Sequence, residues 1–488
     1  MASSSSSTSS IMVGGDDRIS NLPDSIINDI LSFLPTQDVV RTCVLSKRWK
    51  LIWYSVPTIF FSNKNIVFGI EWENEQEKFY NYVEKYFKQR KKGMHRVLGS
   101  SCITSFKLEM KGFYQISNAH LINKWLAFIV KKNKIKEISL SIGKSNRGYY
   151  YHCLPKVFLN NTKFLTNLEL CGVMLDKSHS FNFPLLKTLS LENIKTSYTV
   201  KYEPNVVFKF LLGCPSLEKF RLCWYGLLLI DGMHRLRSLS LKNLELVYTY
   251  VKDLQIDAIN LESLVLTSNS SIFSNSFANI NLSTCNKIKV LSMNDLSITH
   301  VGVMALNSLI SNNPLLENLT LSIMNVPCYY DECHLKISSQ HLKSFYFKNC
   351  YSREAKVTIE SAPELEYFCY EGTIDTIISI ESSNLLSGKM AIYEDCRDYD
   401  AEWYIDMLNF LSNFNCSWNT LSLHVKEFEA LIWPEKFKRV CYSPLLNLKH
   451  LRVITKDSNP ERMSDLKNSL MWISPSLETL SINKMQIF

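Results

Sequence analysis

The sequence predicts an α/β fold in which a small N-terminal module of three helices precedes a long, curved solenoid of short parallel strands. Three observations predict it. Apolar residues recur at helical spacing between residues 20 and 53, a six-residue apolar unit recurs thirteen times after residue 134, and the 488-residue chain is too long for one ordinary compact core. Because 46% of the residues are hydrophobic and only 20% are charged, most of the chain can bury enough apolar surface to fold.

The first segment, residues 1–15, is rich in Ser, Thr and Gly and is expected to be a disordered tail. It lacks the basic start and the apolar run of a secretory signal, and no stretch of the chain approaches the roughly 18 consecutive apolar residues of a membrane span. The 14 cysteines are scattered, without a CxxC pair. We therefore expect a reduced compartment, the nucleus or the cytoplasm or both, and no membrane partner.

The helical module occupies residues 16–62. Its first helix carries apolar residues at spacings of one, three and four, namely Ile26, Ile27, Ile30, Leu31 and Leu34. Pro23 suits the first turn of this helix and Pro35 ends it. Thr36 is placed to cap a second helix and Ser46 to cap a third. Three short helices make a very small core, so the module would gain stability by packing against another surface.

A helical connector over residues 63–133 is expected to lead into the repeats. Its first helix, over residues 71–92, has a buried stripe formed by Phe79, Tyr82, Val83, Tyr86 and Phe87. The basic run at the end of this helix is typical of a helix C-terminus and is less well explained as a nuclear-import signal. A second helix is expected over residues 121–132, around Trp125.

The dominant feature of the chain is a unit of the form apolar-x-x-apolar-x-apolar in residues 134–488. The units begin at Ile135, Leu165, Leu186, Leu217, Leu236, Leu261, Ile288, Leu316, Leu342, Leu365, Trp418, Leu448 and Leu477. Their starts lie 19 to 31 residues apart, except for one gap of 53 residues. Leucine-rich repeats have a period of about 20–29 residues. We therefore predict a leucine-rich-repeat solenoid, with one degenerate repeat hidden between residues 372 and 418.

The form of the unit has a physical cause. Side chains alternate along a strand, so the fourth and sixth residues of a unit share the buried face, and the third, fifth and seventh face solvent. Turn-forming residues follow many of the predicted strands, among them Gly172, Asn193 and Asp295. One unit cannot cover its own apolar face, but stacked units bury a continuous core. The strands are expected to line the concave face, with variable return segments on the convex side.

Residues 21–53, NLPDSIINDILSFLPTQDVVRTCVLSKRWKLIW, resemble the F-box of plant F-box/leucine-rich-repeat proteins. The matching elements are the Leu-Pro-Asp triplet at residues 22–24, the helix ending at residues 30–34, and the segment VLSKRW at residues 44–49. The order of F-box, connector and repeats is also similar to that family, and the resemblance covers the chain after its Ser-rich tail.

The resemblance implies a substrate-recognition adaptor without catalytic activity of its own. F-boxes dock on the Skp-type subunit of a cullin-based (SCF) ubiquitin ligase, while the repeats bind the protein that is to be ubiquitinated. The expected docking residues are Leu22, Pro23, Ile26, Ile27, Ile30, Leu31, Leu34, Val44 and Trp49. Contact with the partner is favoured over a place in the core for Leu22, Pro23 and Ile27, whereas both remain open for Val44 and Trp49.

The concave face predicts the class of target. Its basic and acidic residues nearly cancel, and the whole chain carries only +8. A nucleic-acid ligand would need a row of Lys and Arg to neutralise its phosphates, so no nucleic-acid partner is expected. The tentative target-binding residues are Arg221, Tyr346, Tyr367, His450 and Arg452. Tyr is a common anchor in protein interfaces, although these side chains could instead merely cover neighbouring strands.

The sequence gives little support for an enzyme or a metal site. It contains no GxSxG, GxxxxGK[ST], HExxH or GxGxxG motif. The nearest metal-like group, Cys328, Cys333, His334 and Cys350, lacks the usual zinc spacing. We expect no cofactor and no metal. The alternative to the ligase adaptor is a repeat protein that binds its partner without ubiquitin transfer, including an F-box protein that never joins a cullin.

Overall fold

The chain forms two compact units, Met1–Gly148 and Tyr149–Phe488. The structure is a computed structural model. It describes residues 19, 21–63, 72–93, 103–110, 116–131, 134–143, 151–160, 162–176, 178–196, 206–223, 230–248, 251–267, 279–297, 300–325, 333–350, 355–380, 385–393, 399–414, 418–456, 460–483 and 485–487. The predicted tail over residues 1–15 lies outside the described residues. No helix in the described ranges combines the length and the apolar character that crossing a membrane requires.

The first unit begins with the predicted helices. They are α1 (Asp24–Ser32), α2 (Thr36–Arg41), the short 3-10 turn η1 (Thr42–Val44) and α3 (Lys47–Ile52). Ser46 caps α3 as expected, since its side-chain oxygen accepts a hydrogen bond from the Trp49 backbone N–H at 3.3 Å. The expected role of Thr36 is wrong. Pro35 is the N-cap of α2, and the buried Thr36 hydroxyl accepts instead from the Phe60 N–H at 2.7 Å, joining the helices to the first strand.

The stack of strands in the first unit starts earlier than residue 134. Strand β1 (Thr58–Ser62) pairs in parallel with β2 (Ser105–Met110), and β2 pairs with β3 (Glu137–Ile142). The predicted connector helices are present as α4 (Trp72–Gly93) and α5 (Ala119–Val130), the latter preceded by the 3-10 turn η3 (Ile116–Asn118). The helical module therefore continues directly into a sheet, because only five residues separate the end of α3 from the start of β1.

A buried arginine fixes α4 to the end of the helical module. Arg90 belongs to the basic run at the end of α4, and its side chain is fully buried. It lies four residues after Tyr86, on the buried stripe of α4. Its guanidinium donates hydrogen bonds to the Tyr86 hydroxyl at 2.8 Å and to the Val56 carbonyl at 2.6 Å. Lys91 and Lys92 are exposed, as the helix-end interpretation requires.

The second unit is built on thirteen parallel strands, each paired with the next along the chain. They are β5 (Asn167–Cys171), β7 (Thr188–Glu192), β9 (Lys219–Cys223), β11 (Asn243–Val247), β13 (Ser263–Thr267), β15 (Val290–Ser297), β16 (Asn318–Asn325), β18 (Ser344–Asn349), β20 (Tyr367–Gly372), β22 (Ser387–Ile392), β23 (Thr420–His424), β24 (His450–Ile454) and β25 (Thr479–Ile482). A short β26 (Met485–Gln486) returns antiparallel to β25. The predicted solenoid with parallel strands on its concave face is confirmed.

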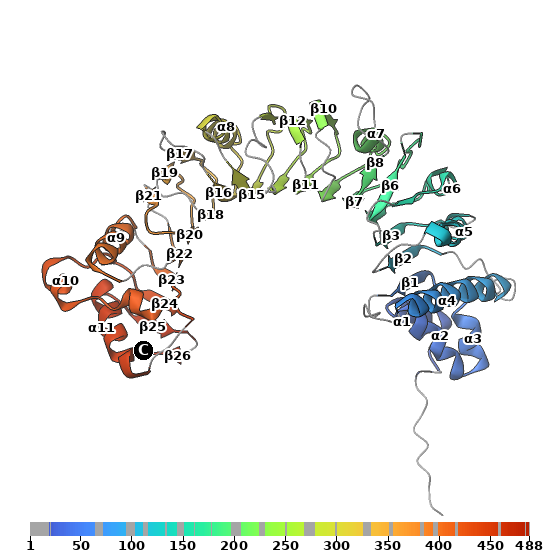
Figure 1. Cartoon of the computed structure of the whole chain (residues 1–488), viewed down its shortest axis with the longest axis horizontal. Coiled ribbons are helices and arrows are strands. Elements are labelled where there is room, and N and C mark those ends of the chain that lie inside the picture. The colour runs from blue at the N-terminus through green and yellow to red at the C-terminus, as the bar shows by residue number, and fades with distance from the viewer. Residues whose placement is uncertain are drawn as a thin grey trace, which may run out of the picture. The chain divides into compact units, whose positions relative to one another are not determined.

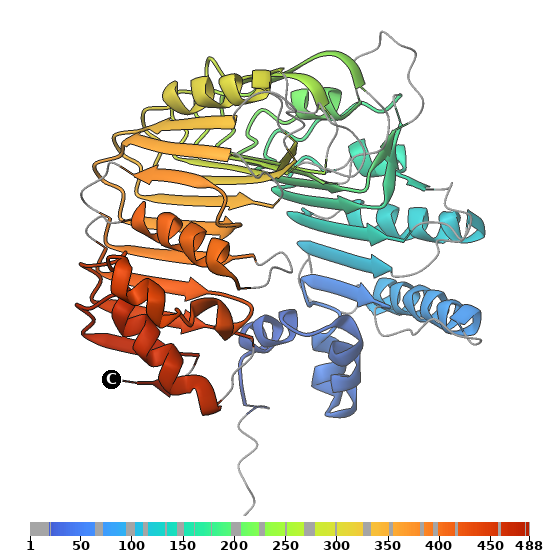
Figure 2. The ribbon, with the colours of Figure 1, turned by 60° about the vertical axis from the view of Figure 1, so that its left-hand side comes forward.

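Return segments cover the convex side of this unit. Figure 1 shows them on the outer side of the arc that these strands form, and Figure 2 shows the strands stacked one beside the next. The helices are α6 (Lys156–Asn160), α7 (Val206–Leu212), α8 (His300–Ser311), α9 (Ala401–Ser412), α10 (Glu435–Val440) and α11 (Met463–Ile473), with 3-10 turns η4 (Phe428–Leu431) and η5 (Pro460–Arg462). Elsewhere the segments form three small parallel sheets. These are β4 (His152–Cys153), β6 (Val173–Leu175) and β8 (Lys195–Thr196); β10 (Ile230–Arg237), β12 (Val251–Asp257) and β14 (Asn279–Asn281); and β17 (Cys333–Ser338), β19 (Ala355–Ser361) and β21 (Ile377–Ile380).

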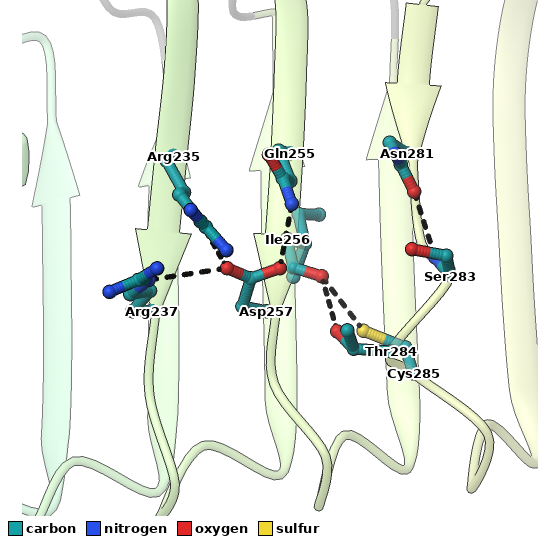
Figure 3. A network of polar contacts seen from close by, with 9 residues as sticks. All are labelled: Arg235, Arg237, Gln255, Ile256, Asp257, Asn281, Ser283, Thr284 and Cys285. Carbon is teal, nitrogen blue, oxygen red and sulfur yellow. Dashed lines mark hydrogen bonds and ion pairs between the residues drawn. The ribbon is translucent and has the colours of Figure 1, made fainter.

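Polar contacts hold the ends of β10 and β12 together. Figure 3 shows Arg235, Arg237 and Gln255 converging on the carboxylate of Asp257. Partial burial alone would raise the pKa of Asp257, but the hydrogen bonds from these three side chains lower it. Asp257 therefore stays ionised near neutral pH and compensates the two guanidinium groups.

One predicted repeat is displaced in the structure, and the predicted hidden repeat is present. The unit expected at Leu236 does not form a concave strand, because Leu236 is the penultimate residue of β10 and is buried on the convex side. The concave strand β11 comes instead from the unit LKNLEL, which starts at Leu241. The hidden repeat predicted between residues 372 and 418 is β22. Its fourth position is Gly388, where a Cβ atom would lie 2.8 Å from the Trp418 ring, so the leucine of the pattern has no room there.

Several strands are followed or interrupted by a residue with positive φ, as the turn chemistry predicts. These residues are Gly172, Asn193, Tyr248, Asp295 and Asn483. Four of them are Gly, Asn or Asp, which tolerate the left-handed region well. Tyr248, with φ of 50°, is the exception, and its backbone N–H is fixed by a 2.7 Å hydrogen bond to the Thr267 carbonyl.

Replacing Tyr248 by Asn is expected to stabilise the second unit by about 0.5–1 kcal/mol, because Asn adopts this backbone conformation at lower cost. The melting temperature of the purified chain, followed by circular dichroism, should rise by a few degrees at most. Tyr248→Ala is the matched control, since it shortens the side chain but lacks the polar group through which Asn stabilises the left-handed conformation. An equal gain with Ala would contradict the assignment of strain to the backbone.

Candidate protein-binding surfaces

The N-terminal helices expose much apolar surface. On α1 and the residues that follow it, Ile26, Ile30, Phe33 and Leu34 lie on one helical face and are exposed. In the turn before α3, Val44 and Leu45 are exposed as well, and the exposed fractions of Phe33 and Val44 reach 87% and 88%. We call these six residues the N-terminal apolar surface. Large apolar side chains exposed to this degree in one small module are typical of an interaction site.

Other predicted docking residues lie in the core of the module. Ile27, Leu31 and Trp49 are buried, so their assignment to a docking surface is wrong. The physical reason is the packing of α1 on α3, which turns Ile27 and Leu31 inward, while Ile26 and Ile30, each one position earlier, face outward. Of the two residues left open, Trp49 is therefore core and Val44 is surface.

Leu22 and Pro23 start the module and remain accessible. Pro23 is exposed and Leu22 is half-buried. Arg48 fixes this segment, since its guanidinium donates to the Leu22 carbonyl at 2.5 Å and to the Asp24 carboxylate at 2.9 Å. Phe33 and Leu45 were missed by sequence analysis, although both are apolar residues beside predicted helix ends.

The second surface is the concave face of the solenoid, where the predicted target-binding residues fall into separate groups. Arg221 on β9 lies between two carboxylates, 3.0 Å from Glu245 on β11 and 3.9 Å from Glu192 on β7. Its charge is therefore compensated within the face. Glu245 was not predicted to face the concave side, because the repeat unit was expected to start at Leu236, five residues before Leu241.

A polar cluster centred on Glu371 lies on β18, β20 and β22. Lys389 lies 3.4 Å from one carboxylate oxygen, and the hydroxyl of Tyr393 donates to the other at 3.2 Å. Tyr346 also donates a hydrogen bond to Glu371. Burial opposes ionisation of Glu371, but these hydrogen bonds and the Lys389 charge lower its pKa. Burial and the neighbouring Glu371 carboxylate raise the pKa of Tyr346, so the phenol stays protonated and remains a donor.

The remaining predicted residues lie close to this cluster. Tyr367 is exposed on β20, the strand that carries Glu371. His450 on β24 hydrogen-bonds the hydroxyl of Thr479 at 2.9 Å, and Arg452, two residues later, is exposed. The structure therefore places Tyr346, Tyr367, His450 and Arg452 on strands β18 to β24 and leaves Arg221 apart on β9. Lys389 was missed because it lies on the hidden repeat.

His152 and Cys153, which are adjacent on β4 (His152–Cys153), have environments that disfavour catalytic roles. Burial lowers the pKa of His152 to about 4 and raises the pKa of Cys153, so the thiolate form of Cys153 is disfavoured at neutral pH. No group of three or more His, Cys, Asp or Glu within the described ranges is arranged to hold a metal ion. Cys328, from the candidate metal group, lies outside those ranges.

Two family models match the chain. The model of the F-box domain matches residues 19–61, and that of the leucine-rich repeats of FBD-associated F-box protein At5g56370 matches residues 122–304. The first match covers the N-terminal apolar surface. The second covers the first strands of the concave face, up to β15.

Curated relatives come from Arabidopsis thaliana. FBD-associated F-box protein At5g27750 is 30% identical over 268 residues, which are 52% of this chain and 54% of that protein. Probable FBD-associated F-box protein At1g32375 is 32% identical over 211 residues, 41% of this chain and 43% of that protein. F-box/LRR-repeat protein At2g42720 is 28% identical over 278 residues, 54% of this chain and 56% of that protein. The chain thus spans about half the length of the curated relatives it matches.

Proposed function

We propose, on the premise that this chain is a plant-type F-box/leucine-rich-repeat protein, that it is the substrate-recognition adaptor of an SCF-type ubiquitin ligase. The N-terminal apolar surface docks on a Skp-type subunit, and through it on a cullin. The concave face of the repeats binds a protein target. The chain itself contributes binding and positioning, and ubiquitin transfer is left to a separate enzyme.

The observation that carries the proposal is the exposure of Phe33, Val44 and Leu45 within residues matched by the F-box model. Burying an apolar side chain of this size is worth about 1.5–3 kcal/mol. Ile26, Ile30 and Leu34 are already about half-buried in the free chain and contribute less, but together the six residues of the N-terminal apolar surface can offset much of an association cost of about 4–15 kcal/mol. The nearly balanced charge of the concave face supports a protein target rather than a nucleic acid.

Co-purification tests the proposal. The full chain, co-expressed with a plant Skp-type subunit and a cullin, is expected to elute with both in one peak on size-exclusion chromatography. Addition of ubiquitin, activating enzyme and conjugating enzyme to that complex should give ubiquitin conjugates. A chain that elutes alone would favour the alternative of a binding module that never joins a cullin.

The cellular compartment of the protein stays a prediction: the nucleus, the cytoplasm or both. The location of a fluorescent fusion of the chain would test it.

A further inference from the structure

The C-terminal half of the concave face carries cations at regular spacing. The fifth positions of five adjacent repeats are in register: Tyr346, Cys369, Lys389, Ser422 and Arg452. Neighbouring strands lie about 4.8 Å apart, so Lys389 and Arg452, separated by two strand steps, lie about 10 Å apart along the solenoid. Lys348 on β18 is paired in register with Glu371 on β20, two positions after Tyr346.

Positive charge exceeds negative charge on these strands. The cations are Lys348, Lys389 and Arg452, and the single carboxylate is that of Glu371, which accepts hydrogen bonds from Tyr346, Lys389 and Tyr393. The carboxylate offsets one of the three positive charges, so two remain. The nearby His424 adds no charge at neutral pH, because burial and the charges of Lys389 and Arg452 lower its pKa.

Arg452 differs from the arginines that are paired with carboxylates on either face. Arg221 is paired with Glu245, and Arg235 and Arg237 share Asp257 (Figure 3). Arg452 makes no hydrogen bond or ion pair with any residue that the structure describes, and it is exposed. An exposed guanidinium with this freedom can form a two-pronged contact with a carboxylate.

Tyrosines accompany these cations. Tyr367 is exposed, and Tyr346 is held by its hydrogen bond to Glu371, so its ring is fixed before any partner arrives. Tyrosines give a large contact area at a low entropic cost, which makes them effective anchors. We call Tyr346, Lys348, Tyr367, Lys389 and Arg452 the Tyr-Lys patch.

We propose that the Tyr-Lys patch binds the target through an acidic segment in the polyproline II conformation with a glutamate at every third residue, running across strands β18 to β24. This conformation has three residues per turn and a rise of about 3.1 Å per residue, so every third side chain returns to the same face after about 9 Å, close to the separation of Lys389 and Arg452. The inference rests on the proposed function, because it specifies what the concave face recognises.

The N-terminal half of the same face carries the opposite excess of charge, which supports binding of the acidic segment to the C-terminal half. On β5 to β11 the exposed or half-exposed carboxylates of Glu169, Glu192 and Glu245 outnumber the cations Lys219 and Arg221. An acidic segment is repelled there, so the charge distribution selects one half of the face for it.

Fluorescence anisotropy with the full chain tests the proposal. The probe is a fluorescein-labelled peptide of repeated Glu-Ser-Ala triplets, compared with the same peptide carrying Gln in place of Glu. Two new ion pairs should make the Glu peptide bind about tenfold more tightly at low salt, and added salt should remove the difference. Equal binding of the two peptides would overturn the proposal. A phosphoserine peptide that binds far more tightly than the Glu peptide would also overturn it, by assigning the patch to phosphate.

Matched variants distinguish binding at the Tyr-Lys patch from a general effect of the net charge of the chain. Arg452→Glu and Lys389→Glu should each lower affinity for the Glu peptide about tenfold. The control is Arg439→Glu, at an exposed position on α10, which changes the net charge by the same amount. This variant should leave the affinity for the Glu peptide unchanged. An equal loss of affinity with Arg439→Glu would refute the assignment of binding to the patch. Co-elution of every variant with the Skp-type subunit keeps the two hypotheses apart. Failure of peptide binding with co-elution intact would reject this inference alone, whereas failure of the wild-type chain to co-elute would reject the proposed function.

Discussion

Val44→Asp combined with Leu45→Asp is expected to weaken association with a Skp-type subunit by about a hundredfold or more. Both side chains are exposed in the free chain, so the substitutions leave the helices intact. In the complex they would remove two apolar contacts worth about 1.5–3 kcal/mol each and place two carboxylates in a desolvated interface. Surface plasmon resonance with the purified subunit measures the loss.

The control for this pair is Val440→Asp on α10, which also changes an exposed valine to aspartate. It lies in the second unit, outside the residues matched by the F-box model. Its affinity for the subunit should equal that of the wild-type chain. Unchanged affinity in the Val44 and Leu45 variant would show that the subunit docks elsewhere or not at all.

Two neighbouring isoleucines are expected to respond in opposite ways to the same substitution. Ile27 is fully buried, so Ile27→Asp would bury a carboxylate without a partner and should destabilise the N-terminal helices by about 4 kcal/mol or more. Ile26 is exposed, so Ile26→Asp should preserve the fold and weaken only the association with the Skp-type subunit. Urea unfolding followed by tryptophan fluorescence, to which Trp49 and Trp53 contribute among the nine tryptophans of the chain, measures the difference.

Ile27→Val refines this test, since loss of one buried methylene should reduce stability by only about 0.5–1.5 kcal/mol and leave docking unchanged. If Ile26→Asp unfolded the module while Ile27→Asp did not, the orientation of α1 would be refuted. For the same reason, loss of docking in an Ile27→Asp variant cannot be attributed to a lost contact, because the helices themselves fail.

These isoleucines also show what the sequence could and could not predict. Helical spacing located α1 within two residues at each end, and Ser46 as a cap located the start of α3. The apolar pattern could not decide between Ile26 and Ile27, because both are equally apolar and only the packing of α1 on α3 sets which one faces inward. The burial of Arg90 could not be predicted either, because a basic residue at a helix end is usually solvated.

The repeats were predictable where leucine fills the buried positions. The pattern failed at Leu236, because LRSLSL and LKNLEL overlap in the sequence and only strand pairing shows that the second lies in the concave sheet. It failed again at Gly388, where the large Trp418 ring takes the space of the expected leucine. Both failures reflect tertiary packing that overrides a local pattern.

The clusters of the concave face depend on register, which the sequence does not contain. Glu371, Lys389 and Tyr346 come from three different repeats and meet only because β18, β20 and β22 pair in sequence. The same pairing compensates Arg221 with Glu245 and leaves Arg452 unpaired among the described residues. Residue type alone therefore identified plausible contacts, but not which charges remain available to a partner.

Hydrogen–deuterium exchange of the full chain, with and without a saturating Skp-type subunit, tests the central claim most directly. The account predicts slower exchange in the peptides that cover residues 26–45, because docking on the N-terminal apolar surface protects α1, α2 and η1. The concave strands should exchange at the same rate in both samples. Protection on strands β18 to β24 with none over residues 26–45 would contradict the assignment of the two surfaces.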